Sequence, residues 1–273
     1  MPSSSRVPLF DPQRILAATS LSRIEYREEL GSTNDLALEL ARQVDTPLPL
    51  LVLTDQQTAG RGRGVRRWWS AAGALTCSVV IEVDPSQLPR PRAALISLTT
   101  ALAIADALQS LVPDAVIGLK WPNDVLIGAG KVCGVLVESP PHPAGRFVIG
   151  FGLNVNNSSA QAPIELRATV TSLRDAAQRD FDLQDVLIRI LQRLTEYVQL
   201  LTVNGLDPSD RWSPRCVLTG RTVEVEIGRQ RLAGVCQGID RDGALLVHTS
   251  QGQQRCRSGT VRLANPGTNC RLW

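Results

Sequence analysis

Four short apolar segments between residues 115 and 156 constrain the fold of this chain more than any other feature. They are AVIGLK (115–120), DVLI (124–127), KVCGVLVES (131–139) and RFVIGFGLNVN (146–156). Only the tripeptides WPN and GAG separate the first three segments, so no helix fits between them. Because short links join neighbouring antiparallel strands, this stretch predicts a meander of mostly antiparallel pairs.

The segments on either side of this meander predict further strands and helices. Strands are expected at LLVLTD (50–55) and at GALTCSVVIEV (73–83), where apolar residues recur with a period of two. Helices are expected at 11–19, 35–44, 91–112 and 182–201, with Asp11 and Asp182 as N-caps. The helix at 91–112 is the most apolar, but it contains Asp106, so a buried helix is expected rather than a membrane span.

Beyond residue 208 the chain becomes a series of short strand-like pieces separated by Gly or Asp-Gly turns. The pieces are TVEVEI, RLAGVCQGI, GALLVHT and QQRCRSG. They predict a small all-β module of roughly 55 residues, the scale at which small barrels occur. We therefore expect an α+β domain at 1–208, with a mixed, mostly antiparallel sheet flanked by helices, and a β module at 209–273.

Composition limits where such a chain works and what it binds. The formal net charge is only +3, so any cationic function has to be local rather than spread over the protein. The six cysteines are scattered without a C-x-x-C motif, which favours a reducing compartment over a disulfide framework. The first ten residues lack the apolar core of a signal peptide. We expect a cytoplasmic protein that has no membrane partner.

The common catalytic and nucleotide-binding motifs are missing from the sequence. There is no G-x-x-x-x-G-K-[ST] loop, and the glycines that begin at Gly60 do not satisfy G-x-G-x-x-G. The two histidines, His142 and His248, stand in no triad or metal-ligand spacing. The remaining class of chemistry works by positioning substrates and neutralising negative charge, as nucleotidyl transfer does.

The stretch GRGRGVRR (60–67) has the composition for that task. Its glycines allow close backbone approach, and Arg61, Arg63 and Arg66 can each bind phosphate or carboxylate with two hydrogen bonds. Taken alone, the stretch is equally typical of a solvated loop or of an RNA-contacting segment. Other motifs are also ambiguous when taken singly: KWPND could be a turn, and Lys131 a surface lysine. In the same way, the STN at 32–34 could simply cap a helix.

The order of these motifs along the chain is more specific than any one of them. The series STN, QTAGRGR, W-x-S, KWPND, GK-x-x-G-x-L-x-E and GFGLNVN resembles the biotin protein ligases, the biotin–[acetyl-CoA-carboxylase] ligases. The resemblance covers most of the chain, and Lys131 follows Asp124 by seven residues, as in that family. It implies a fold like that of class II aminoacyl-tRNA synthetases and biotin ligases, with a C-terminal SH3-like β-barrel.

The resemblance also implies a reaction and a set of site residues. Such enzymes join biotin to ATP with Mg²⁺, form biotinyl-5′-AMP, and pass biotin to a lysine of a biotin carboxyl carrier domain. Lys131, Arg61 and Arg63 are implied as catalytic residues. The implied biotin contacts are Ser32, Thr33, Asn34, Gln57, Arg61, Gly62, Arg63, Lys131, Gly134, Gly150 and Gly152. The implied nucleotide contacts are Arg63, Arg66, Trp68, Asn123, Lys131 and Asn154, and the implied metal ligands are Asp124 and Asn154.

Two departures from the family pattern bear on these expectations. The family loop is GRGRxGR, whereas this chain has Gly64 followed by Val65, so Gly64 has to supply the flexibility. We expect this loop to be disordered until ligand binds. Only about 30 residues precede Gly31, too few for a winged-helix DNA-binding domain. We therefore expect no nucleic-acid partner, in a monomer or a homodimer.

Two alternative functions follow from the same residues. A ligase of this fold could activate lipoate or octanoate instead of biotin. A protein of a different class could use GRGRGVRR as an RNA- or DNA-binding arm on a non-catalytic domain, with salt-sensitive binding.

Overall fold

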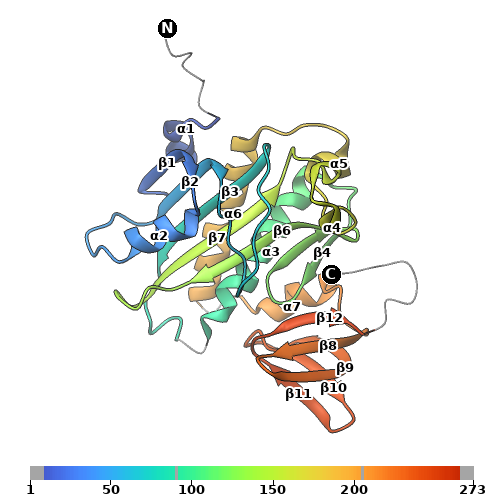
Figure 1. Ribbon diagram of the computed structural model, residues 1–273. Helices are drawn as coiled ribbons and strands as arrows, with labels where there is room; N and C mark the ends of the chain where they lie inside the picture. Colours follow the sequence, from blue (N-terminus) through green and yellow to red (C-terminus); the bar gives the residue numbers. More distant parts are fainter. Residues whose placement is uncertain (1–8, 90–91, 204–205, 265–273) are drawn as a thin grey trace.

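A seven-stranded mixed sheet forms the larger part of the molecule (Figure 1). The computed structural model describes residues 9–89, 92–203 and 206–264. The strands are β1 (Arg23–Leu30), β2 (Leu50–Gln57), β3 (Ala74–Glu82), β4 (Ile117–Lys120), β5 (Asp124–Ile127), β6 (Gly130–Glu138) and β7 (Arg146–Asn154). Their order is β1-β2-β3-β7-β6-β5-β4. The β4–β7 meander is antiparallel throughout, as predicted.

Strand β1 is the one element of this sheet that the sequence pattern did not predict. It lies at the edge and pairs parallel with β2, from Arg23 opposite Leu50 to Leu30 opposite Gln57. Its sequence RIEYREEL is rich in charge, and no residue in it is fully buried. An edge strand needs no continuous apolar face, and its charges oppose pairing with another chain.

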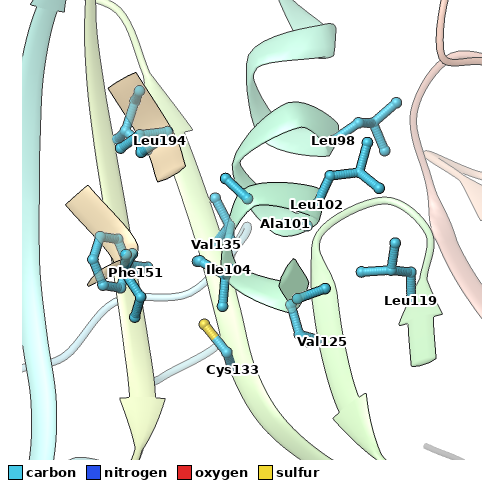
Figure 2. Close-up of a cluster of buried hydrophobic side chains, with 14 of the residues drawn as sticks. Leu98, Ala101, Leu102, Ile104, Leu119, Val125, Cys133, Val135, Phe151 and Leu194 are labelled. Atoms are coloured by element: carbon cyan, nitrogen blue, oxygen red, sulfur yellow. The ribbon is translucent and has the colours of Figure 1, made fainter. Parts of the chain in front are cut away.

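Helices cover both faces of the sheet. Helix α2 (Thr33–Ala41) packs on one face, where Ala37, Leu40 and Ala41 meet residues of β2, β3 and β7. Helices α1 (Pro12–Ala18), α3 (Ala94–Leu111) and α6 (Leu183–Thr202) bury their apolar residues in the larger core on the other face. Figure 2 shows Leu98, Leu102 and Ile104 of α3 in the same buried cluster as residues of β4 to β7.

Two local predictions for the helices are confirmed. The carboxylate of Asp11 accepts from the first backbone N–H groups of α1, and Asp182 does the same for α6. Helix α3 is long and apolar enough to cross a membrane, but 67% of it is buried inside the protein. It is therefore the buried core helix that its polar residues predicted.

The C-terminal module is a second, all-antiparallel sheet. Its strands are β8 (Thr222–Ile227), β9 (Gln230–Ile239), β10 (Leu245–Thr249), β11 (Gly252–Cys256) and β12 (Thr260–Leu263), in the order β11-β10-β9-β8-β12. A closed barrel would need β11 to pair with β12, and within the described residues the sheet stays open at these two strands.

Short helices lie in the segment between β7 and α6 and in the segment that joins the two sheets. They are α4 (Ile164–Arg167), α5 (Leu173–Ala177), α7 (Pro208–Trp212) and the 3₁₀ turns η2 (Ser159–Gln161) and η3 (Ser213–Arg215). Helix α7 contacts both α3 and β9, and the side chain of Trp212 is fully buried there. The predicted domain boundary between residues 208 and 209 falls within α7 and stays a prediction.

Candidate functional site

A polar cavity of about 100 Å³ lies on the face of the sheet that carries α2. The structure gathers nearly all of the predicted site residues around it. They are Ser32, Thr33, Asn34, Gln57, Arg61, Gly62, Arg63, Arg66, Trp68, Asn123, Asp124, Lys131, Gly134, Gly150 and Gly152. These residues come from α2, from strands β2, β5, β6 and β7, and from the loops between them, so only the tertiary fold brings them together.

Asn154 is the exception among the predicted site residues. The alternation of β7 puts it on the same face as Gly152, but its side chain is buried and does not line the cavity. Its amide nitrogen donates to the carbonyl of Thr171 (3.0 Å), and its oxygen accepts from Asn157 (2.9 Å). Because residues 169–171 pair with Lys131, they cover this end of β7. Asn154 thus holds the cavity wall together.

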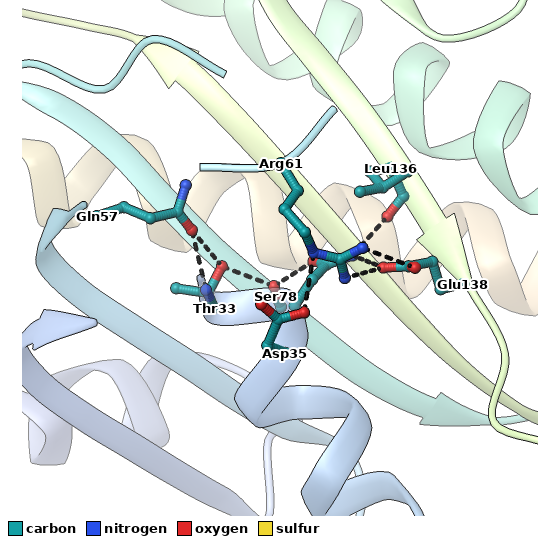
Figure 3. Close-up of polar contacts among 8 residues, drawn as sticks. Thr33, Asp35, Gln57, Arg61, Ser78, Leu136 and Glu138 are labelled. Carbon is teal, nitrogen blue, oxygen red and sulfur yellow. Dashed lines mark hydrogen bonds and ion pairs between the residues drawn. The ribbon is translucent and has the colours of Figure 1, made fainter. Parts of the chain in front are cut away.

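A buried hydrogen-bond network forms one end of the cavity (Figure 3). The side-chain oxygen of Gln57 accepts from the backbone N–H of Thr33 (2.9 Å). The Ser78 hydroxyl donates to Asn34 Oδ1 (2.6 Å) and lies 2.8 Å from the Thr33 hydroxyl. Ser32 is the N-cap residue of α2 but makes no side-chain cap. Helix capping therefore does not explain the STN motif, whose threonine and asparagine are buried at the cavity.

Arg61 joins this network to the arginine loop. Its guanidinium bonds both oxygens of Glu138 (3.1 and 2.6 Å), and its Nε lies 2.9 Å from Asp35. Hydrogen bonding to Glu138 is the main cause that raises the pKa of Arg61. Glu138 also accepts from the side-chain amide of Asn34 (2.8 Å). Our sequence reasoning missed Glu138, although it is the last residue of GK-x-x-G-x-L-x-E, and it missed Asp35 and Ser78, which no motif marks.

The rest of the arginine loop folds back on itself. The backbone N–H of Gly62 donates to the carbonyl of Arg66 (2.8 Å), and that of Trp68 to Gly60 (3.0 Å). Gly64 has a φ of +64°, and Val65 is fully exposed without a positive φ. The glycine at position 64 therefore makes the left-handed turn, so the valine carries no strain there.

Glycines on β7 make room for two side chains that cover the sheet. A Cβ on Gly150 would lie 1.8 Å from Asn34 Oδ1, and one on Gly152 would lie 2.2 Å from the Trp68 ring. The indole nitrogen of Trp68 and the hydroxyl of Thr76, which also lines the cavity, are buried without hydrogen-bond partners. Buried polar atoms rarely stay unpaired, so both atoms suit contact with a ligand.

Lys131 lies at the opposite end of the cavity from the network. Its ammonium is 2.6 Å from Asp124 Oδ1 and 5.6 Å from the centre of the Trp68 ring. The neighbouring Asn123 uses its amide on the carbonyl of Val135 (2.6 Å), which fixes the turn between β4 and β5. Asp124 is therefore the ion-pair partner of Lys131 in this structure.

A second pocket, of about 280 Å³, adjoins Lys131 and reaches the C-terminal module. Five of its lining residues are cationic: Arg63, Arg66, Lys120, Lys131 and Arg262. Arg63 donates to the carbonyl of Gly259 (3.2 Å), and Arg66 to the hydroxyl of Thr260 (3.1 Å). Burial lowers the pKa of Arg63 and lowers that of Lys120 to about 8. Such a pocket favours a polyanion.

Acidic residues are sparse around both cavities. Among the described residues, no group of three or more His, Cys, Asp and Glu side chains could hold a metal ion. Of the two predicted metal ligands, Asp124 lines the cavity and pairs with Lys131, whereas Asn154 does not reach it. A single carboxylate still fits Mg²⁺ that is bound mainly through the phosphates of a nucleotide.

Comparison with known proteins gives matches over both parts of the chain. Residues 26–154 match the model of the biotin/lipoate A/B protein ligase family, and residues 218–263 match that of the biotin protein ligase C-terminal domain. The biotin–[acetyl-CoA-carboxylase] ligase of Mycobacterium tuberculosis is 35% identical over 242 residues, which cover 86% of each chain.

Other relatives extend this comparison. The bifunctional ligase/repressor BirA of Bacillus spizizenii is 30% identical over 242 residues, which cover 87% of this chain and 73% of that protein. Among solved structures, the biotin protein ligase of Aquifex aeolicus in complex with biotin and ATP superposes with a TM-score of 0.78. It is 25% identical, and the match covers 89% of this chain and all of that one.

Proposed function

This chain belongs to the biotin protein ligase family, and from that premise we propose how its own residues carry out the reaction. The enzyme activates biotin with ATP to biotinyl-5′-AMP and then transfers the biotinyl group to a lysine of a biotin carboxyl carrier domain. Both steps need two reactants held together, and adenylation needs a cationic site for two anions; the joined cavities provide this.

The buried network binds the polar ring of biotin. Thr33, Asn34 and Gln57 present hydroxyl and amide groups that match the donors and acceptors of a ureido group. The indole of Trp68 covers the glycine backbone of β7 and packs along the acyl chain. Biotin is therefore held with its carboxylate directed toward Lys131.

The position of Lys131 is the single observation that carries this proposal. It lines both the polar cavity and the cationic pocket, so one ammonium can contact the biotin carboxylate and the α-phosphate of ATP. The carboxylate oxygen attacks the α-phosphorus, and pyrophosphate leaves. Since a carboxylate is already a nucleophile, this step needs no general base, in keeping with a site without histidine.

The cationic pocket receives the phosphates. Negative charge develops on the leaving pyrophosphate during adenylation. Positive charge is supplied there by Arg63 and Arg66 from the loop, Lys120 from β4 and Arg262 from β12. Mg²⁺ bound to those phosphates would add charge neutralisation, with Asp124 as the nearest carboxylate. In the second step the acceptor amine attacks the carbonyl carbon and AMP leaves.

A transfer assay tests the proposal. The protein is incubated with ATP, Mg²⁺, biotin and an apo carrier domain, and mass spectrometry measures biotin on the carrier. One biotin per carrier is expected, and no transfer would refute the function. Lys131→Ala should abolish adenylate formation. The control variant Arg231→Ala changes an exposed side chain away from the site and should not. A parallel reaction with lipoate in place of biotin tells which of the two acids the enzyme activates.

Oligomeric state, cytoplasmic location and the absence of a nucleic-acid partner stay predictions. The edge strand β1 is the sheet edge at which a second copy would pair, and its charged residues Glu25, Arg27 and Glu29 oppose such pairing. Sedimentation at several protein concentrations distinguishes a monomer from a homodimer.

A further inference from the structure

Glu138 is the last residue of β6, and its side chain stands behind the wall of the polar cavity rather than in it. Because side chains alternate along a strand, Glu138 lies on the same face as Gly134 and Leu136, which do line the cavity. Its carboxylate bonds two cavity residues at once, Asn34 and Arg61 (Figure 3). Glu138 can therefore act on a ligand through these two partners.

The first partner, Asn34, has its side-chain amide oriented by these bonds. The amide nitrogen donates to Glu138 Oε2 (2.8 Å) and to the carbonyl of Leu136 (3.3 Å), and Oδ1 accepts from the Ser78 hydroxyl (2.6 Å). An ionised carboxylate has only acceptors, so the amide nitrogen has to face it. Both N–H groups of Asn34 are then used within the protein, and what this residue offers a ligand is the second lone pair of Oδ1.

That lone pair lies where the ligand is held. Oδ1 of Asn34 stands over the backbone of Gly150, which lines the cavity, and a Cβ on Gly150 would lie 1.8 Å from it. A ureido ring carries N–H donors, whereas the dithiolane ring of lipoate carries none. Because a buried acceptor without a donor is unfavourable, an acceptor fixed in this direction favours a ring with N–H groups.

The second partner, Arg61, is the first arginine of the loop. Its guanidinium makes two bonds to Glu138 (3.1 and 2.6 Å), and its Nε lies 2.9 Å from Asp35 of α2. The side chain of Glu138 is 28% exposed and that of Asp35 61%, so the pair with Glu138 is the stronger one. Arg61 thus holds the loop to β6 and α2, while Arg63 and Arg66 line the cationic pocket.

We propose that Glu138 is a positioning residue that links recognition of the biotin ring to the position of the arginine loop. Its carboxylate fixes Asn34 with the amide oxygen toward the ligand, and the same carboxylate anchors the loop through Arg61. Since one oxygen, Oε2, serves both partners, loss of the charge weakens both contacts together. This inference rests on the proposed function.

Four variants separate the two contacts. Glu138→Gln keeps the size of the side chain and removes its charge, and Glu138→Asp, which keeps the charge, replaces it if the first variant does not fold. Arg61→Gln removes the loop contact but leaves Glu138 bonded to Asn34. Glu196→Gln is the control, because Glu196 is 50% exposed on α6 and pairs with the neighbouring Arg193. Thermal melts check that each variant folds.

The ligand contact is measured by calorimetry with two ligands. They are biotin and an analogue in which oxygen replaces one ureido N–H, taken as the isomer that the unmodified protein binds more weakly. The unmodified protein, Arg61→Gln and Glu196→Gln should bind the analogue about tenfold more weakly than biotin or worse. In Glu138→Gln the Asn34 amide is free to turn and donate, so this ratio should fall to about threefold or less. A side chain that only stabilised the fold would change both affinities alike.

The loop contact is measured by trypsin cleavage after Arg63 and Arg66 at saturating biotin. Glu138→Gln and Arg61→Gln should each be cut about fivefold faster than the unmodified protein or more. The double variant should be cut no faster than either single variant, because removal of one partner already breaks the bond.

Two results would overturn the role of Glu138. An unchanged ratio of the two Kd values in Glu138→Gln would mean that Glu138 does not orient Asn34. Faster cleavage of the double variant than of both single variants would mean that Glu138 does not act on the loop through Arg61. Failure of the proposed function has a different signature: the unmodified protein would bind biotin but release no pyrophosphate with ATP, and the ratio of Kd values would still test Glu138.

Discussion

The ammonium of Lys131 lies 2.6 Å from the carboxylate of Asp124, on the neighbouring strand of the meander. The seven-residue spacing of these two residues becomes a contact because β5 and β6 pair antiparallel across a tight turn. The carboxylate holds the ammonium at the junction of the two cavities, where both substrates of the adenylation step can reach it.

Asp124→Asn should slow adenylation while keeping the shape of the site. Loss of a charged hydrogen bond costs about 1.5–3 kcal/mol, which predicts a decrease of about 10- to 100-fold in kcat. Biotin-dependent exchange of labelled pyrophosphate into ATP measures it. Asp114→Asn, at an exposed loop position, is the control and should leave the rate unchanged. A normal exchange rate in the Asp124 variant would show that Lys131 needs no orienting partner.

Gly150→Ala should weaken biotin binding by displacing Asn34. The new Cβ would lie 1.8 Å from Asn34 Oδ1, so the asparagine has to leave its bonds to Ser78 and Glu138. We expect the Kd for biotin to rise at least tenfold in calorimetry, with a lower Tm. Gly31→Ala has open space around its Cβ and should behave like the unmodified protein. Equal affinities in the two variants would count against the assignment of Asn34.

Gly64→Ala should disturb the arginine loop, whereas Val65→Ala should not. At a φ of +64° an alanine costs about 1 kcal/mol, and Val65 is fully exposed without such strain. Cleavage by trypsin after the loop arginines measures loop order. The loop is predicted to be disordered until ligand binds, so saturating biotin and ATP should slow cleavage in the unmodified protein. The same ligands should protect the Gly64 variant less. Cleavage that ligand does not change would contradict the role of the loop as a lid.

ATP binding should weaken as pH rises through about 8. Burial lowers the pKa of Lys120 to about 8, helped by the charges of Lys131, Arg66 and Arg262, while Asp124 opposes the shift. Below that pH Lys120 is charged and attracts phosphate; above it the pocket loses one positive charge. The KM for ATP should therefore rise between pH 7 and pH 9. An arginine keeps its charge over this range, so Lys120→Arg should abolish the rise in KM. If the variant and the unmodified protein show the same pH profile, Lys120 does not cause the rise.

Patterns within short windows of the sequence determined much of this protein. The period of two in β3, the short links of the meander and the caps Asp11 and Asp182 were all confirmed, because each depends on neighbouring residues alone. The ordered motifs likewise predicted the family, and of the site residues that they implied all but Asn154 line the cavity. Strand β1 was not predicted, because an edge strand that pairs with one neighbour needs no apolar pattern.

Only the tertiary structure decided which distant groups meet. Arg61 and Glu138 are 77 residues apart, and Arg63 lies 196 residues from Gly259, so no local pattern could pair them. The alternation of β7 directs Asn154 toward the cavity face, yet residues 169–171 cover it. Sequence determines which side chains each strand can present. The packing of segments far apart in the chain determines which of them reach a substrate.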